Sequence, residues 1–279
     1  MEVLYALIGA LPFDWVGSHF MQSAFLAVLL VTPLFGLLST MVVSNRMAFF
    51  SDSLGHGAFT GIALGVLFGS VSPLLSLVVF SILFALLITW IKGKSAASAD
   101  TIIGVFSSTA IALGLMLMSR GGGFNKFSAY LIGDILSVSE DDIRALACVF
   151  VLVAAVWGIL FNRLLVLSLN ASFARSRGIS AFWTESAFAA MLAVLVSISI
   201  QWVGILIINA LLVLPAAAAR NVTNSVKSYH AVSVLCAMSA GVAGLIIAYC
   251  FNMAAGATIV VALAVLFFVT LALKPHFVR

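Results

Sequence analysis

Two side chains that can bind a cation lie one helical turn apart within the apolar segment 47–69. They are Asp52 and His56. Residues at i and i+4 of a helix face the same side, with Cβ atoms about 5–6 Å apart. One carboxylate oxygen and one imidazole nitrogen could then bind the same ion, since both are zinc ligands at about 2.0–2.2 Å. The alternative is a structural hydrogen bond between the pair or to a neighbouring backbone.

The depth of the pair in its segment favours a functional role. Counted from Met47 at about 1.5 Å per residue, Asp52 and His56 lie roughly 8–14 Å from the segment's edge, in a hydrocarbon layer about 30 Å thick. A charge at mid-bilayer costs about 2.5–3.5 kcal/mol, and such residues usually have a functional partner. We therefore interpret the pair as metal ligands.

A glycine ladder follows the pair on the same segment. Glycines recur at every fourth position: Gly57, Gly61, Gly65 and Gly69. This small-xxx-small spacing lets the backbone of another helix approach closely. The ladder predicts tight helix packing, but packing does not account for the buried carboxylate.

The elements that position these residues are membrane helices. Of 279 residues, 64% are hydrophobic and 8% are charged, against about 25% charged in a soluble domain. The mean hydropathy is +1.27. A span needs about 20 apolar residues. We predict an all-α, polytopic membrane protein with a single domain over 1–279 and about nine spans (eight to ten), at 20–44, 47–69, 73–91, 101–119, 143–161, 180–202, 203–219, 231–251 and 256–273.

The Lys and Arg residues predict the orientation. With alternating spans, one side receives Arg46, Lys92, Lys94, Arg163, Arg175, Arg177, Arg220, Lys227, Lys274 and Arg279, and the other receives Arg120, Lys126 and Arg144. Positive residues favour the cytoplasm. The carboxyl terminus is therefore predicted inside and the amino terminus outside, with 3–17 as an interfacial segment. The inside loop 162–179 is the largest cytoplasmic feature, and Glu185 is expected to face the cytoplasmic interface.

Enzymatic chemistry is not indicated. Gly93, Lys94 and Ser95 imitate the end of a nucleotide-binding loop, but the glycine required five residues earlier is Ile88. No sequence motif for hydrolysis is present. The pI of about 9.2 follows from the cytoplasmic charges, so no nucleic-acid partner is expected.

The stretch RMAFFSDSLGHGA at 46–58 resembles the signature of the permease subunits of bacterial ABC transporters that import zinc, manganese or iron(II). Four further stretches resemble the same family: 102–115 its fourth span, 130–136 its outer partial helix, 174–178 its cytoplasmic coupling segment and 203–216 its seventh span. Nearly the whole chain is covered. The sequence departs from the family at Gly55, where Ser or Ala is usual, and at Asn170, Ala171 and Ser172, where acidic residues are usual.

The resemblance implies a permease in the bacterial cytoplasmic (inner) membrane, surrounded by lipid. Two copies would form the pathway, with two ATP-binding subunits inside and a metal-binding protein outside. Ala174, Arg175, Arg177 and Gly178 would contact the ATPase, which hydrolyses ATP in place of this chain. Asp52 and His56 from each copy would give four ligands for transported Zn²⁺, or for Mn²⁺ or Fe²⁺, and no permanent cofactor is expected.

Two alternatives remain at this point. A proton-coupled secondary transporter could use Asp52 and His56 as a proton relay, although such folds usually contain internal repeats and the Asp-x-x-x-His segment has no second copy. An intramembrane metalloenzyme would need a general base beside the metal, and the sequence offers no such motif.

Overall fold

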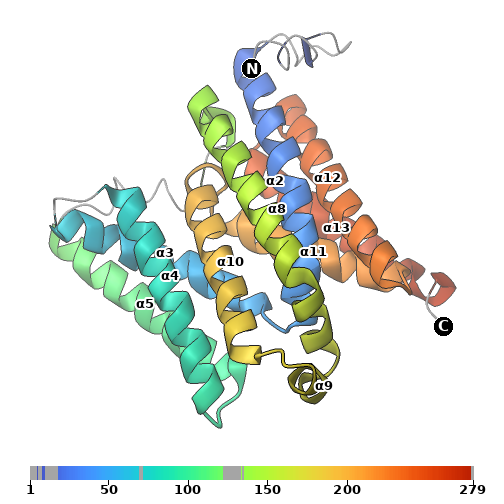
Figure 1. Ribbon diagram of the computed structural model, residues 1–279. Coiled ribbons are helices and arrows are strands. Elements are labelled where there is room, and N and C mark those ends of the chain that lie inside the picture. The colour runs from blue at the N-terminus through green and yellow to red at the C-terminus, as the bar shows by residue number, and fades with distance from the viewer. Residues whose placement is uncertain are drawn as a thin grey trace. The chain divides into compact units, whose positions relative to one another are not determined.

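The computed structural model describes residues 5, 8–9, 18–68, 72–121, 133 and 135–277. Every regular element in these ranges is helical (Figure 1), which confirms the all-α prediction. The long helices are α2 (His19–Ser44), α3 (Ala48–Phe68), α4 (Pro73–Lys94), α5 (Ala99–Gly121), α8 (Glu140–Leu169), α10 (Ala181–Val203), α11 (Ile205–Val222), α12 (Val226–Phe251) and α13 (Ala255–Phe277). The short elements are η2 (Ile135–Ser137) and α9 (Ala171–Ser176).

The long helices coincide with the predicted spans. Within the described ranges, seven are long and apolar enough to cross a membrane, all except α3 and α11. Helix α3 contains the polar run from Ser51 to His56, and α11 has only a shorter apolar stretch, Ile207–Val222. The chain is thus a multi-pass membrane protein, while nine crossings and the orientation stay predictions.

Two compact units make up the chain, and neither is continuous in sequence. Unit 1 comprises Met1–Thr40, Ile132–Leu152 and Trp202–Arg279, and unit 2 comprises Met41–Leu131 and Val153–Gln201. Unit 2 holds α3, α4 and α5, and also α9 and nearly all of α10. The candidate metal pair and the predicted coupling segment therefore belong to the same unit.

Close helix contacts hold unit 1 together. Helix α13 packs against α11 and α12. A Cβ on Gly244 of α12 would lie 2.6 Å from the Cα of Ile259 on α13, so only glycine permits this approach. The Ser39 and Ser233 hydroxyls are joined by a buried 2.9 Å hydrogen bond. Small residues and buried hydroxyls thus replace the hydrophobic effect, which contributes little between helices in lipid.

The junction between α10 and α11 lies two residues later than predicted. The sequence placed it at Gln201 and Trp202, whereas α10 continues to Val203 and the break occurs at Gly204, with φ 80°. That φ is readily accessible only to glycine. A Cβ on Gly133 would also lie 2.2 Å from the Gly204 nitrogen, so two backbone segments meet here.

In unit 2, the glycine ladder lies against α4. A Cβ on Gly57 would lie 3.2 Å from the Phe84 ring, and one on Gly65 would lie 2.7 Å from the Ser76 hydroxyl. At Gly61 the nearest atom is the Cα of Leu77, at 3.0 Å. Three of the four glycines thus let α3 approach α4 closely. Gly69 lies outside the described residues, as do the segment 122–132 of the outer loop, Asp134 and most of 3–17.

Substituting Gly61 by leucine should destabilise unit 2. The added side chain would meet α4 backbone, which cannot move as a flexible side chain can. Overpacking of this kind costs about 1–3 kcal/mol. Gly158→Leu is the matched control, because nothing lies within 4 Å of a Cβ there. Thermal unfolding of the purified variants in detergent measures the difference, and equal midpoints for the two would contradict this account of the ladder.

Candidate functional site

Asp52 and His56 form a pair on α3. The Asp52 Oδ1 atom lies 3.5 Å from the His56 Nε2 atom, and the side chains are 45% and 35% exposed, respectively. Two ligand atoms bound at about 2.0–2.1 Å to a tetrahedral ion are separated by about 3.3 Å. The pair is therefore spaced as two ligands of one ion would be, and both side chains remain accessible to it.

The pair opens onto a cavity of about 360 Å³ within unit 2. From α3, the lining residues are Phe49, Asp52 and His56; from α5, they are Asp100, Ile103, Gly104, Ser107, Ser108 and Ile111. The α5 residues recur at spacings of three and four, so they occupy one face of that helix. The ladder faces α4 and the pair faces α5, so α3 uses different faces for packing and for the cavity.

A single chain offers only part of a metal site. Within the described ranges, no group of three or more His, Cys, Asp or Glu side chains could hold a metal ion. Asp52 and His56 supply two protein ligands, whereas a protein-bound zinc takes at least three. The described His, Cys, Asp and Glu side chains therefore do not complete a metal site.

Sequence reasoning missed the α5 side of this cavity. Asp100, Ser107 and Ser108 were not singled out, although their spacing on a mostly apolar helix was a usable signal. The sequence did not show which helix would face Asp52 and His56, and so the polar face of α5 could not be connected with them.

The predicted coupling loop 162–179 is shorter than expected. Helix α8 has 30 residues and continues to Leu169, so 162–169 are helical and not a loop. At about 1.5 Å per residue it is roughly 45 Å long, more than the hydrocarbon thickness of about 30 Å. The part of the predicted loop outside α8 is reduced to α9 and its two connections.

Local capping defines α9. The Asn170 side chain accepts hydrogen bonds from the backbone N–H groups of Ser172 and Phe173, at 2.9 and 3.0 Å. The helix ends in a turn in which Gly178 has φ 73°. Ala174 is fully buried, which anchors α9. Arg175, Arg177 and Gly178 are exposed. Of the four candidate coupling residues, Ala174 thus anchors the helix and the other three lie on the surface.

An ion pair joins α4 to α10 in unit 2. The Lys92 Nζ atom lies 2.7 Å from the Glu185 Oε2 atom, with side chains 28% and 23% exposed. Glu185 was expected to face the cytoplasmic interface, and its partner 93 residues away was not foreseen. The contact fixes the end of α4 to the helix that follows α9.

Glu185→Gln should lower the stability of the protein. It leaves the largely buried Lys92 ammonium without its anionic partner, and a hydrogen bond to a charged group contributes about 1.5–3 kcal/mol. The double variant Lys92→Met, Glu185→Leu removes both charges and should recover much of the loss. Thermal unfolding midpoints in detergent measure both. A double variant less stable than Glu185→Gln would contradict this view of the pair.

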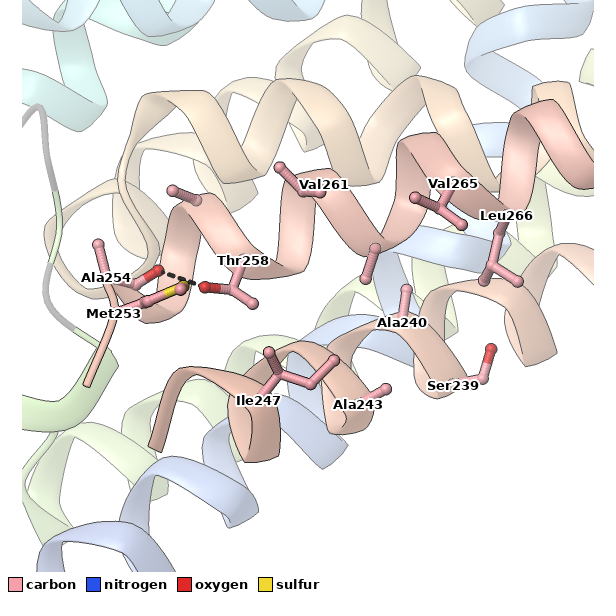
Figure 2. Close-up of a pocket in the computed structure, with 12 residues that line it drawn as sticks. Ser239, Ala240, Ala243, Ile247, Met253, Ala254, Thr258, Val261, Val265 and Leu266 are labelled. Atoms are coloured by element: carbon pink, nitrogen blue, oxygen red, sulfur yellow. Dashed lines mark hydrogen bonds between the residues drawn. The ribbon is translucent and has the colours of Figure 1, made fainter. Parts of the chain in front are cut away.

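A larger hollow, in unit 1, lacks ion-binding chemistry. It has a volume of about 580 Å³ and lies between α12 and α13 (Figure 2). Its only side-chain polar groups are the Ser239 and Thr258 hydroxyls, and Thr258 donates to the Ala254 carbonyl at 2.9 Å. Since no charged side chain lines it, the candidate ion site stays with Asp52 and His56.

Comparisons with known proteins agree along almost the whole chain. The profile of the ABC 3 transport family matches residues 17–274. The chain is 30% identical to the manganese import system permease protein ScaB of Streptococcus gordonii, covering 92% of each. It is 28% identical to the high-affinity zinc uptake system membrane protein ZnuB of Buchnera aphidicola, covering 88% of this chain and 94% of that protein. The solved structure of PsaBC from Streptococcus pneumoniae in complex with Fab matches with a TM-score of 0.76 and 30% identity, covering 97% of this chain and 95% of that one.

Proposed function

The chain belongs to the ABC 3 transport family, and from that premise we propose that Asp52 and His56 are the ion ligands of an ATP-driven importer of divalent metal. Relatives spanning most of the chain are named as permease or membrane proteins of manganese and zinc import systems. The chain is accordingly the permease subunit of a metal ABC importer in the bacterial inner membrane, and not an enzyme. The observation that carries the ligand assignment is the 3.5 Å separation of the pair beside a cavity that a second carboxylate, Asp100, also lines.

Two copies of the chain complete the site in this proposal. Around a two-fold axis, each copy contributes the same residues. Two carboxylates and two imidazoles then form a four-ligand set, which suits a tetrahedral Zn²⁺. The two negative charges also balance the ion's charge where water is scarce. This arrangement accounts for the incomplete ligand set of a single chain.

The remaining partners follow from the transport cycle. ATP is hydrolysed by separate cytoplasmic subunits, and α9 with Arg175, Arg177 and Gly178 is the surface on which they dock. An external metal-binding protein delivers the ion. The anchored Ala174 and the Lys92–Glu185 ion pair would transmit movement of α9 to other helices of unit 2.

Zinc is the proposed cargo, with manganese next. Mixed imidazole and carboxylate ligands accept either ion, and the general affinity order places zinc above manganese and iron(II). The relatives are named for manganese import or for zinc uptake, so our choice of zinc as the cargo rests on the general order of affinities. A proton-coupled transporter or an intramembrane metalloenzyme is not favoured by any feature of the described site.

Cellular metal content tests this function. A strain without the gene should contain less zinc than its parent when zinc is limiting, and the cloned gene should restore it. A deficit in manganese alone would reverse the choice of cargo. Unchanged contents of zinc, manganese and iron, each tested as the limiting metal, would overturn the importer function for this chain.

A further inference from the structure

The cavity beside Asp52 and His56 has a polar strip on α5 that the proposed site does not use. Asp100, Gly104, Ser107 and Ser108 lie on one face of this helix and line the cavity. Other α5 side chains, such as Val105 and Met116, are large, apolar and exposed. From Asp100 to Ser108 the strip extends about 12 Å along the helix. It is long enough to accompany an ion beyond its first ligands.

The register of α3 against α5 places Asp100 at one end of this path. The Thr60 hydroxyl donates a hydrogen bond to the Ala110 carbonyl, which aligns the two helices. Both begin at the same end, since α4 returns the chain between them (Figure 1). Asp52 precedes Thr60 by eight residues and Asp100 precedes Ala110 by ten. At about 1.5 Å per residue, Asp100 lies about 3 Å beyond Asp52 and about 9 Å beyond His56 toward the predicted cytoplasmic end.

Asp100 lies in the first turn of α5, where its charge stabilises the helix dipole, but neither a helix cap nor an ion pair among the described residues holds its side chain. The start of α5 is capped by Ser98, whose hydroxyl accepts the Thr101 backbone N–H at 3.2 Å. Asp100 is exposed, and no ion pair involves it among the described residues. It forms no common metal-binding group with Asp52 and His56. In this structure its carboxylate lines the same cavity without joining the pair as a third ligand.

Resting on the proposed function, we propose that Asp100 is the next contact for the divalent cation after it leaves Asp52 and His56. An ion moving toward the beginning of α5 approaches the positive end of that helix dipole. Without a nearby carboxylate this end would repel the cation. Asp100 offsets the repulsion and supplies oxygen ligands, while the hydroxyls of Ser107 and Ser108 lie near the level of His56, on its side away from Asp100. Gly104 keeps the strip open, since nothing lies within 4 Å of a Cβ there.

The test uses the full importer, with its ATPase and binding protein, reconstituted in vesicles. Asp100→Asn should lower the maximal uptake rate of Zn²⁺ or Mn²⁺ about tenfold. Binding of the same ion to the purified permease should be unchanged, because Asp52 and His56 are intact. Asp100→Glu keeps the charge and should retain most of the uptake. Asp141→Asn is the matched control, because this exposed carboxylate on α8 pairs with Arg144 and is not among the residues that line the cavity.

Each outcome decides the proposal. Parent-like uptake by Asp100→Asn, with Asp52→Asn inactive, would overturn the role of Asp100 and leave the proposed function standing. Loss of ion binding together with uptake would place Asp100 in the first ligand set and overturn the sequential contact. An equal loss in Asp100→Glu, or a matching fall in thermal stability, would show a structural role instead. Parent-like uptake by both Asp52→Asn and Asp100→Asn would remove the proposed site itself.

Discussion

Asp52→Asn should abolish most metal uptake while the protein still inserts into the membrane. The substitution keeps the size and the hydrogen-bonding capacity of the side chain but removes its negative charge. In a two-copy site, the ion would face two imidazoles and two neutral amides. Each uncompensated charge at mid-bilayer costs about 2.5–3.5 kcal/mol, and two are left here, so the rate should fall at least about 100-fold.

His56→Ala should give a similar loss for a different reason, since it removes two of the four ligands from the two-copy site. Uptake of radioactive zinc or manganese into vesicles, measured beside protein abundance, checks both variants. The defect should persist when the external binding protein is saturated, because it lies in the pathway and not in delivery. Nearly normal transport by Asp52→Asn would mean that the pair serves only as a structural hydrogen bond.

Gly178→Trp should uncouple ATP hydrolysis from transport. Nothing lies within 4 Å of a Cβ at this position, so the new side chain projects outward from α9 without clashing inside the protein. It would stand beside Arg175 and Arg177 on the proposed docking surface. Disruption at the centre of an interface commonly costs about 2 kcal/mol or more, so we expect uptake to fall more than about tenfold.

The control for this variant addresses the backbone. Gly178 has φ 73°, a conformation that costs most other residues about 1–2 kcal/mol. Gly178→Ala carries this strain with a small side chain, and it should transport nearly as well as the parent. Uptake and ATPase activity are measured together in reconstituted vesicles. Equal losses in the two variants would assign the defect to strain, and normal transport by Gly178→Trp would move the docking surface elsewhere.

Helix positions and the pairing of Asp52 with His56 could be predicted from the sequence, because both depend on local geometry. A spacing of four residues brings two side chains to one face of any α-helix. The exceptions at helix ends have local causes that hydropathy does not report. The break at Gly204 depends on a positive φ, and α8 continues to Leu169 through Asn162 and Arg163, the polar residues before which the predicted span ended.

The sequence alone determined that this is an all-helical membrane protein, and it predicted a candidate cation-binding pair on one helix and a glycine-rich packing face beyond it. Only the tertiary structure decided what meets those faces: α4 against the ladder, Asp100 and the α5 strip across the cavity, and Glu185 against Lys92. The physical reason is that lipid is as apolar as the helix surfaces. Hydrophobic patterning therefore identifies membrane helices but does not distinguish a helix-facing side from a lipid-facing side, and the partners emerge only from close packing.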